Sequence, residues 1–306
     1  MRLLYVIDPL DTLNLETETS LLMMEEAARR GHQNAITTIG DLYLDGARAC
    51  ARARAITLNL AERPFYRLAD LGDSPLEDFD LVLMRKDPPV DAAYLAATFV
   101  LERATASVPV INEPSSLRLV NEKLLPLAFA PFTPPSIFTN ERARMREFVA
   151  RHGRSILKPL ADCSGRGIVI LPDPEAVPPD LGGQFVLVQQ YIDAVIEGDK
   201  RIFVLAGRPL GAVNRIPRGP LQLANIHQGA IVAPTSITRR DQEIIDAIAP
   251  TLISRGLWMA GIDVIGGYLT EINVTSPSAV RQINAVSGSN IERELVDFLE
   301  SKARRR

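Results

Sequence analysis

Short apolar runs alternate with amphipathic stretches through the first third of the chain. Residues 3–7, 81–84 and 108–111 are continuous apolar runs of strand length. A stretch of helical period follows each of the first two runs. This succession of strand, helix and strand predicts an α/β fold with a parallel sheet, in which functional side chains gather at the carboxyl ends of the strands.

Two helices can be placed by their apolar spacing and their polar starts. Residues 21–28 follow Thr19 and Ser20, either of which can cap a helix. Residues 241–254 repeat the pattern later in the chain, with Asp241 as the expected cap. Each helix ends before a glycine, as is typical of a helix carboxyl end.

The pattern changes after residue 120, where short strand-like runs replace the long alternation. Residues 155–157, 168–171 and 185–188 are such runs, and a loop of small residues at 161–167 separates the first two. Residues 216–236 have no regular period, which predicts a long loop of the kind that often closes over a binding site.

Glycine turns in the last third join apolar segments and predict two β-hairpins. They pair 201–206 with 210–215 across Gly207, and 259–265 with 269–274 around Gly266-Gly267.

Composition excludes several classes of protein. The 306 residues are 46% apolar and 23% charged, and 34 basic against 37 acidic side chains give a net charge of −3. Nucleic-acid binding is disfavoured because it needs a basic surface. No apolar run reaches the roughly 18 residues of a membrane span, and the amino-terminal run is too short for a signal peptide. Two cysteines make no disulfide framework, so a cytoplasmic location is expected.

The second hairpin carries the most informative side chains. Asp263, Glu271 and Asn273 lie among strand-forming residues and supply the hard oxygen ligands that suit Mg²⁺. A plain two-residue turn would place Asp263 opposite Thr270, whereas a three-residue loop or a bulge would place it opposite Glu271. A magnesium site therefore requires the loop or the bulge. The alternative is an ordinary hairpin with a polar face toward solvent.

Two lysines and one loop could bind phosphate. Lys158 stands at a strand end and Lys123 at a helix start, where each could reach a nucleotide phosphate, although each could equally be a surface lysine. Backbone amides of residues 161–167 could cradle phosphate oxygens. The chain has neither a Walker A motif nor a strand-linked Gly-x-Gly-x-x-Gly, which argues against the common nucleotide-binding folds.

Arginines near predicted strand ends complete the candidates. Arg201 and Arg215 lie in the first hairpin, Arg85 follows the run at 81–84, and Arg281 lies close to the carboxyl end of the second hairpin. Arginines at such positions can hold carboxylates or phosphates through two hydrogen bonds, but each taken alone is as well explained as a surface charge.

Taken together, these motifs resemble the ATP-grasp superfamily, and within it the bacterial glutathione synthetase family. The resemblance spans nearly the whole chain. It is carried by Asp8-Pro9, Gly40-Asp41-Leu42-Tyr43, Arg85-Lys86-Asp87-Pro88-Pro89, Asn121-Glu122-Lys123-Leu124, Ile156-Leu157-Lys158-Pro159, Gly198-Asp199-Lys200-Arg201, Arg215-Ile216-Pro217, Thr270-Glu271-Ile272-Asn273-Val274-Thr275-Ser276-Pro277 and Arg281.

The resemblance implies an ATP-dependent carboxylate–amine ligase that works through an acyl phosphate. It implies ATP and Mg²⁺, with Mn²⁺ as a possible substitute, as cofactors, and a small peptide-like acid and an amine as substrates. The implied ATP-binding residues are Lys123, Lys158 and Gly165 at the phosphates, Gln189, Gln190, Tyr191 and Ile192 at the adenine, and Asp199 near the ribose.

The remaining roles also follow from the resemblance alone. Asp263, Glu271 and Asn273 would hold Mg²⁺, and Arg201 and Arg215 would stabilise the transferring phosphoryl group. Arg85, Asp87, Ser276 and Arg281 would bind the acid. The implied domains are an amino-terminal substrate domain (1–120), a central lid domain (121–188) and a carboxyl-terminal catalytic domain (189–306) with an antiparallel sheet. A homo-oligomer is expected from the family.

Two segments depart from the family pattern. Residues 219–236 lack the expected glycines and have Leu223 where an arginine is usual, and Ala161-Asp162-Cys163-Ser164-Gly165 replaces a loop richer in glycine. We expect glutathione synthesis from γ-glutamylcysteine, glycine and ATP. The alternatives are a related ligase with another acid or amine, and a binding or regulatory protein of the same fold without turnover.

Overall fold

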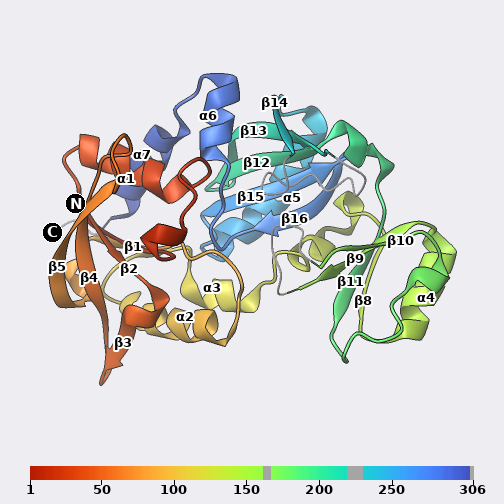
Figure 1. Cartoon of the computed structure of the whole chain (residues 1–306), viewed down its shortest axis with the longest axis horizontal. Coiled ribbons are helices and arrows are strands. Elements are labelled where there is room, and N and C mark those ends of the chain that lie inside the picture. The colour runs from red at the N-terminus through yellow and green to blue at the C-terminus, as the bar shows by residue number, and fades with distance from the viewer. Residues whose placement is uncertain (161–166, 219–229, 304–306) are drawn as a thin grey trace.

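Three sheets lie in a row in the computed structural model, which describes residues 1–160, 167–218 and 230–303 (Figure 1). Sheet A lies at the end that holds both chain termini, sheet C in the middle, and sheet B at the far end. The fold is α/β, as the alternating pattern predicts, with antiparallel sheets B and C after residue 120.

Sheet A has a parallel centre and an antiparallel margin. Its strand order is β3-β4-β2-β1-β6-β7, with β5 paired to β4. The pairs of β1 with β2, β1 with β6, and β6 with β7 are parallel, which confirms the predicted arrangement. The strands are β1 (Arg2–Val6), β2 (Gln33–Thr37), β3 (Leu42–Asp45), β4 (Arg48–Leu58), β5 (Tyr66–Pro75), β6 (Leu81–Met84) and β7 (Val110–Ile111).

Three helices accompany sheet A in the sequence: α1 (Thr19–Arg29), α2 (Ala92–Ala104) and α3 (Pro114–Leu119). The expected cap of α1 is wrong. The Glu18 side chain caps it by accepting from the Ser20 amide at 2.7 Å, while the Ser20 hydroxyl accepts a hydrogen bond from Arg85. Thr19 and Ser20 are the first two residues of the helix and are fully buried, and neither is its cap.

Sheet B is antiparallel, in the order β10-β9-β11-β8, and one helix packs on it. Met145, Phe148 and Val149 of the helix form a small core with Leu157 and Val188 of the sheet. The elements are β8 (Ser136–Thr139), α4 (Arg142–His152), β9 (Ser155–Pro159), β10 (Val169–Leu171) and β11 (Val186–Gln190).

Sheet C is antiparallel, in the order β14-β13-β12-β15-β16. It contains both predicted hairpins. Its strands are β12 (Asp199–Leu205), β13 (Arg208–Ile216), β14 (Ile231–Pro234), β15 (Met259–Ile265) and β16 (Tyr268–Asn273). The expectation that 216–236 is entirely loop is wrong for β14, a short edge strand whose proline is tolerated because an edge position leaves one side of the backbone unpaired.

The helix α5 (Arg239–Ser254) begins two residues before the expected start. Thr238 is the cap: its hydroxyl accepts from the Asp241 amide, and the Asp241 side chain accepts from the Thr238 amide in return. Asp241 is therefore the third residue of a capping box and not the cap itself, which corrects the prediction.

Two helices complete the carboxyl-terminal part: α6 (Val280–Ser287) packs on β13 and β14 of sheet C, and α7 (Ile291–Lys302) packs against α1. His32 lies between the amino terminus (3.2 Å from its Nδ1) and the Glu300 carboxylate (2.7 Å from its Nε2). These contacts place the amino terminus beside the last turns of α7 (Figure 1). A single hydrophobic cluster contains residues of sheets A and C, so these two sheets share a core.

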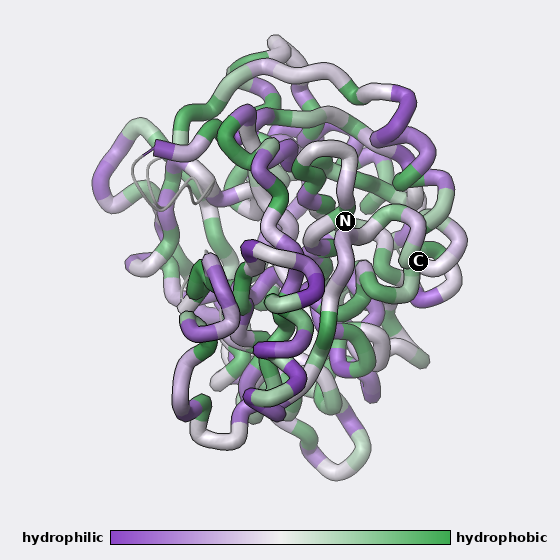
Figure 2. Tube along the Cα trace, turned by 90° about the vertical axis from the view of Figure 1, so that its right-hand side faces the viewer, coloured by the Kyte–Doolittle hydropathy of each residue, from purple (hydrophilic) through white to green (hydrophobic). Residues whose placement is uncertain are grey.

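The buried core consists mainly of hydrophobic side chains, and several turns at the outline of the molecule are hydrophilic (Figure 2). Among the described residues, no helix combines the length and the apolar character needed to cross a membrane.

Candidate active site between sheets B and C

The hairpin of β15 and β16 brings two carboxylates to one face of sheet C. Its turn is the two-residue Gly266-Gly267, and both glycines have positive φ angles of 55° and 78°. The register shifts after Val264 pairs with Leu269, so that Asp263 lies opposite Glu271 and Thr270 is the extra residue of a bulge. The bulge is one of the two geometries that a magnesium site requires.

Asp263 is the centre of a buried ion-pair network. Its two carboxylate oxygens lie 2.5 Å and 2.9 Å from Arg201 nitrogens, and Arg215 Nη2 lies 2.9 Å from Oδ1. Arg215 Nη2 also lies 2.5 Å from Asp199 Oδ2. Burial would raise the pKa of Asp263, but the two guanidinium groups outweigh it and hold that pKa well below its usual range. Asp263 is therefore an anion at neutral pH.

Asp199 has the opposite electrostatic balance. Burial raises the pKa of its carboxyl group above the usual range; Arg215 opposes the rise, and the nearby Asp263 charge adds to it. The structure thus places Asp199 in the charge network of sheet C. Its expected place near a ribose stays a prediction.

Glu271 and Asn273 extend the oxygen-rich face. The Glu271 side chain is about one quarter exposed, and its carboxylate lies 3.6 Å from Lys123 Nζ. The Asn273 amide nitrogen donates to the Gly261 carbonyl at 3.0 Å and lies 3.4 Å from Asp263 Oδ2. Because its nitrogen is directed there, its carbonyl oxygen is the atom that can bind a cation. Carboxylate and amide oxygens are ligands that suit Mg²⁺.

Lys158 of sheet B is partly buried and lies within electrostatic reach of Glu271, Asp199 and Asp263. Its Nζ donates to Gln189 Oε1 at 2.9 Å, and Gln189 in turn donates to Ser136 Oγ at 3.0 Å. Burial lowers the pKa of Lys158, and the charges of Glu271 and Asp199 act in the opposite direction. Lys123 and Lys158 therefore both lie near the acidic face, and their contact with ATP phosphates stays a prediction.

The residues predicted to contact the adenine lie at the end of β11 and directly after it. Gln190 closes β11 and donates its amide to the His152 carbonyl at 3.3 Å. The Tyr191 ring stacks under Arg154 at 3.8 Å, and Ile192 leads the chain toward sheet C. The expected phosphate-loop glycine, Gly165, lies outside the described residues, as do residues 219–229 of the expected closing loop.

A second cluster lies where β6 ends. Arg85 is buried, and it donates to Ser20 Oγ at 3.0 Å and to the Pro277 carbonyl at 2.9 Å. Its Nη1 is buried without a hydrogen-bond partner in the described structure. Burial lowers the pKa of Arg85. A buried guanidinium with a free donor is suited to a carboxylate of a bound molecule.

Asp87 and Ser276 join this cluster, as predicted. The pKa of Asp87 is raised to about 6, mainly by burial and to a smaller extent by the charge of Glu18, while a hydrogen bond from Ser276 opposes the rise. Asp8, which the sequence did not single out as a site residue, accepts from the Asp87 amide at 2.9 Å and pairs with Lys86 at the same distance. The signal for Asp8 was its place directly after the first strand.

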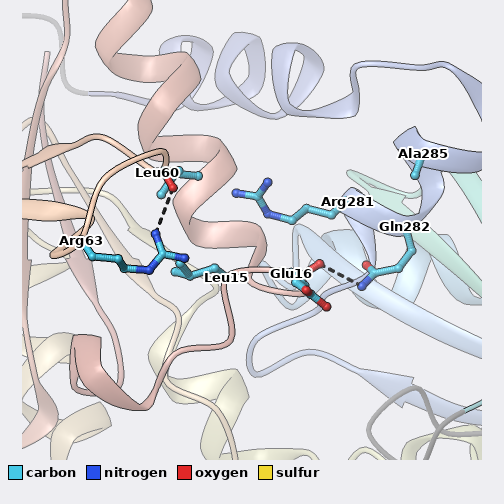
Figure 3. Close-up of a pocket in the computed structure, with 7 residues that line it drawn as sticks. All are labelled: Leu15, Glu16, Leu60, Arg63, Arg281, Gln282 and Ala285. Atoms are coloured by element: carbon cyan, nitrogen blue, oxygen red, sulfur yellow. Dashed lines mark hydrogen bonds between the residues drawn. The ribbon is translucent and has the colours of Figure 1, made fainter.

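Arg85 contacts the start of α1 through Ser20, and Arg281 contacts it through the Glu18 carbonyl. Arg281 also lines an open pocket of about 440 Å³ with Leu15, Glu16, Leu60, Arg63, Gln282 and Ala285 (Figure 3). Its guanidinium lies 3.4 Å from the Glu18 carbonyl through Nε and 3.8 Å from the Glu25 carboxylate through Nη2. Arg85, Asp87 and Ser276 are not among the residues lining this pocket.

Sequence reasoning missed Asn112 and Glu122. Asn112 bonds the backbone of Met259 and Val274 with its side-chain amide, and Glu122 accepts from the backbone of Val274 and Thr275. Glu122 stands in the quoted Asn121-Glu122-Lys123 motif, but only its lysine suggested a function. No sequence signal marks a side chain whose partners lie about 150 residues away.

The described part of the chain contains no group of three or more His, Cys, Asp and Glu side chains placed to hold a metal. The candidate site instead combines the carboxylates of Asp199, Asp263 and Glu271 with one amide oxygen, and the basic side chains of Lys123, Lys158, Arg201 and Arg215 lie around them. Basic side chains beside hard oxygen ligands are suited to a polyphosphate and its metal ion.

Two family models match the chain. The model described as prokaryotic glutathione synthetase, N-terminal domain, matches residues 1–118, and the model described as prokaryotic glutathione synthetase, ATP-grasp domain, matches residues 122–288.

Curated relatives match over almost the full length. A protein named glutathione synthetase from Gloeobacter violaceus is 40% identical over 98% of this chain and 96% of its own. Proteins of the same name from Salmonella typhimurium and Escherichia coli O127:H6 are 37% and 36% identical, each over 97% of both chains.

Solved structures share the fold at lower identity. A D-cycloserine synthetase superposes with a TM-score of 0.66 at 14% identity, covering 97% of this chain and 99% of its own. A RimK domain protein of ATP-grasp type from Sphaerobacter thermophilus superposes with a TM-score of 0.63 at 20% identity, with the same coverage. Both support the ATP-grasp fold.

Proposed function

The chain belongs to the prokaryotic glutathione synthetase family, and from that premise we propose which residues carry out each step of its reaction. It is an ATP-dependent ligase that forms a carbon–nitrogen bond, and its family uses ATP with Mg²⁺. The reaction is glutathione synthesis: γ-glutamylcysteine, glycine and ATP give glutathione, ADP and phosphate. The single observation that carries the residue assignment is the pairing of Asp263 with Glu271 across the β-bulge.

Activation of the acid comes first. A carboxylate resists attack by an amine, so its oxygen attacks the γ-phosphorus of ATP, and an acyl phosphate forms as ADP leaves. We assign Lys123 and Lys158 to the ATP phosphates, since both lie beside the acidic face of sheet C. Gly165 belongs to the same assignment by sequence alone. Asp263, Glu271 and Asn273 would hold Mg²⁺, which when bound would neutralise charge on the ATP phosphates.

We assign to Arg201 and Arg215 the stabilisation of the negative charge that develops on the transferring phosphoryl group. Their ion pairs with Asp263 and Asp199 hold both guanidinium groups in fixed orientations before the reaction begins. Preorganised donors of this kind need no rearrangement as charge develops. The adenine is assigned to the strand end with Gln189, Gln190, Tyr191 and Ile192, and the ribose to Asp199.

We assign the peptide acid to Arg85, Asp87, Ser276 and Arg281. The buried Arg85, with its free Nη1, can bind a carboxylate of the peptide, and Asp87 can bind its ammonium group when ionised. The glycine amine then attacks the acyl carbon, phosphate leaves, and the ammonium proton passes to solvent or phosphate. Water must be kept out until that attack, because it would hydrolyse the acyl phosphate.

The wider assignments rest on the family as well. We propose domains at 1–120, 121–188 and 189–306, a cytoplasmic location and a homo-oligomer. Size-exclusion chromatography with light scattering tests the last of these directly.

Phosphate release tests the function. Purified protein with ATP and Mg²⁺ should release phosphate only when γ-glutamylcysteine and glycine are both present, and mass spectrometry should detect glutathione in equal amount. Omission of either substrate and addition of EDTA are the controls. The unusual sequence of residues 219–236 favours one competing function, a ligase with another acid or amine. Release only with other acid–amine pairs would support that function instead.

A further inference from the structure

The segment that follows β16 is held almost entirely by side chains from the first 122 residues. The amides of Val274 and Thr275 donate to Glu122 Oε1 at 2.6 Å and 2.9 Å, and the Thr275 hydroxyl donates to the same oxygen at 2.9 Å. The Val274 carbonyl accepts from Asn112 Nδ2 at 2.7 Å. The Pro277 carbonyl accepts from Arg85. Residues 274–277 thus connect sheet C to the end of sheet A.

Glu122 also completes the outer edge of sheet C. β16 is an edge strand, so its outward backbone groups have no strand partner. The Ile272 amide donates to the Glu122 backbone carbonyl at 3.0 Å, and the Glu122 side chain accepts from the amides of Val274 and Thr275. Glu122 therefore fixes the backbone on both sides of Asn273.

Both neighbours of this contact belong to the proposed active site. Lys123, next in sequence to Glu122, lies 3.6 Å from the Glu271 carboxylate. Ser276 lies inside the held segment and hydrogen-bonds Asp87. A shift of residues 274–277 would therefore move the acid-binding side chains relative to the phosphate-binding ones.

We propose that Glu122 is a positioning residue: through its three hydrogen bonds to Val274 and Thr275 it sets the acid-binding segment 274–277 at a fixed distance from the metal-binding strand β16. This inference rests on the proposed function for the roles of Glu271, Asn273 and Ser276. The contact itself is independent of those roles.

The side chain and the backbone of Glu122 have separable effects. The bond from Ile272 to the Glu122 carbonyl survives any side-chain substitution, so Lys123 should stay in place. Loss of the carboxylate should release only residues 274–277. The peptide acid should therefore be affected more strongly than ATP.

The test compares Glu122→Ala and Glu122→Gln with a matched control, Glu113→Ala. Glu113 is another acidic side chain that accepts from nearby backbone and hydroxyl groups, at the start of α3, and it does not bond residues 274–277. Hydrogen exchange of the Val274 and Thr275 amides reads the contact without turnover. Steady-state kinetics with each substrate varied, and titration with a non-hydrolysable ATP analogue and Mg²⁺, read its effect on the site.

We expect Glu122→Ala to speed exchange at both amides by about 10-fold or more, because both amides lose their hydrogen-bond acceptor. The ratio kcat/KM for γ-glutamylcysteine should fall by at least about 10-fold, while the affinity for the ATP analogue stays within about threefold. Glu122→Gln should recover most of the rate, since its carbonyl oxygen can still accept. If Glu122→Ala does not fold, Glu122→Asp, which is one methylene shorter, should change in the same direction.

Unchanged exchange at Val274 and Thr275 would overturn the proposal. So would kinetics of Glu122→Ala that match those of Glu113→Ala, because the role would then be stability alone. A wild-type protein that makes no glutathione would contradict the proposed function, and the exchange measurement would still decide whether Glu122 holds the segment.

Discussion

The two clusters of the proposed active site differ in how they are built and in how far their charges are already paired. In the sheet C cluster, Asp263 is matched by Arg201 and Arg215 before any ligand arrives. In the cluster at the end of sheet A, Arg85 is buried with a free Nη1, and the pKa of Asp87 is raised. The first cluster is preorganised for a reaction with developing charge, and the second is completed by the molecule it binds.

The two clusters also differ in the sequence distance that they span. One hairpin, residues 259–273, supplies every proposed metal ligand. The second cluster combines residues near positions 8, 20, 85 and 276, which meet only when the whole chain has folded. We therefore expect substitutions in sheet C to abolish turnover and those at the end of sheet A to weaken binding of the acid.

The largest effect is expected from Asp263→Asn, which keeps the shape of the side chain and removes its charge. Turnover should fall by at least about 1000-fold, because a metal ligand is weakened and two guanidinium groups lose their shared anion. The free energy of unfolding in urea should fall by about 3–5 kcal/mol, the usual cost of leaving a buried charge unpaired. Asp246→Asn on the exposed face of α5 is the control, and a similar rate in both variants would contradict the comparison.

A smaller, selective effect is expected from Arg85→Lys. Lysine keeps the charge but cannot bond Ser20, Pro277 and a substrate carboxylate in the fork geometry of arginine. The KM for γ-glutamylcysteine should rise by roughly 10- to 100-fold, with the KM for ATP within about threefold. Equal rises in both KM values would show that the two clusters do not bind different substrates.

These outcomes bear on what the sequence can predict. The hairpin of Asp263 and Glu271 was predictable because both strands and their turn lie within 15 residues. Successive side chains of a strand point to opposite faces of the sheet, so Asp263 can lie opposite Glu271 only if the turn has a third residue or a strand has a bulge. The strand at 81–84 was predictable from its unbroken apolar run. The segment that became β14 was not, because four residues ending in proline carry no periodic signal.

Long-range partners set the limit of prediction at the site. The sequence marks Ser20 as a helix cap, but the fold uses its hydroxyl for Arg85, 65 residues away. It marks Lys123 as functional but gives no sign that the adjacent Glu122 holds Thr275. Such contacts depend on how the sheets pack against one another, which no local pattern records.

The smallest effect is expected from pH. The pKa of Asp87 is raised to about 6, so its carboxyl group is mostly neutral below that pH and mostly ionised above it. If ionised Asp87 binds the substrate ammonium group, kcat/KM for γ-glutamylcysteine should fall severalfold as the pH drops from about 7 to about 5. Asp87→Asn should have the low value throughout and lack this step. A wild-type profile that is flat over this range would contradict the role given to Asp87.

The central claim is that Glu271, placed opposite Asp263 by the bulge, binds the magnesium that serves the ATP phosphates. Its most direct test is turnover of Glu271→Ala with γ-glutamylcysteine, glycine, ATP and Mg²⁺, measured beside Glu147→Ala on the exposed face of α4, with circular dichroism to verify folding. We predict a folded protein whose kcat is lower by at least about 100-fold, while Glu147→Ala is unchanged. A rate for Glu271→Ala within about twofold of wild type would contradict the claim.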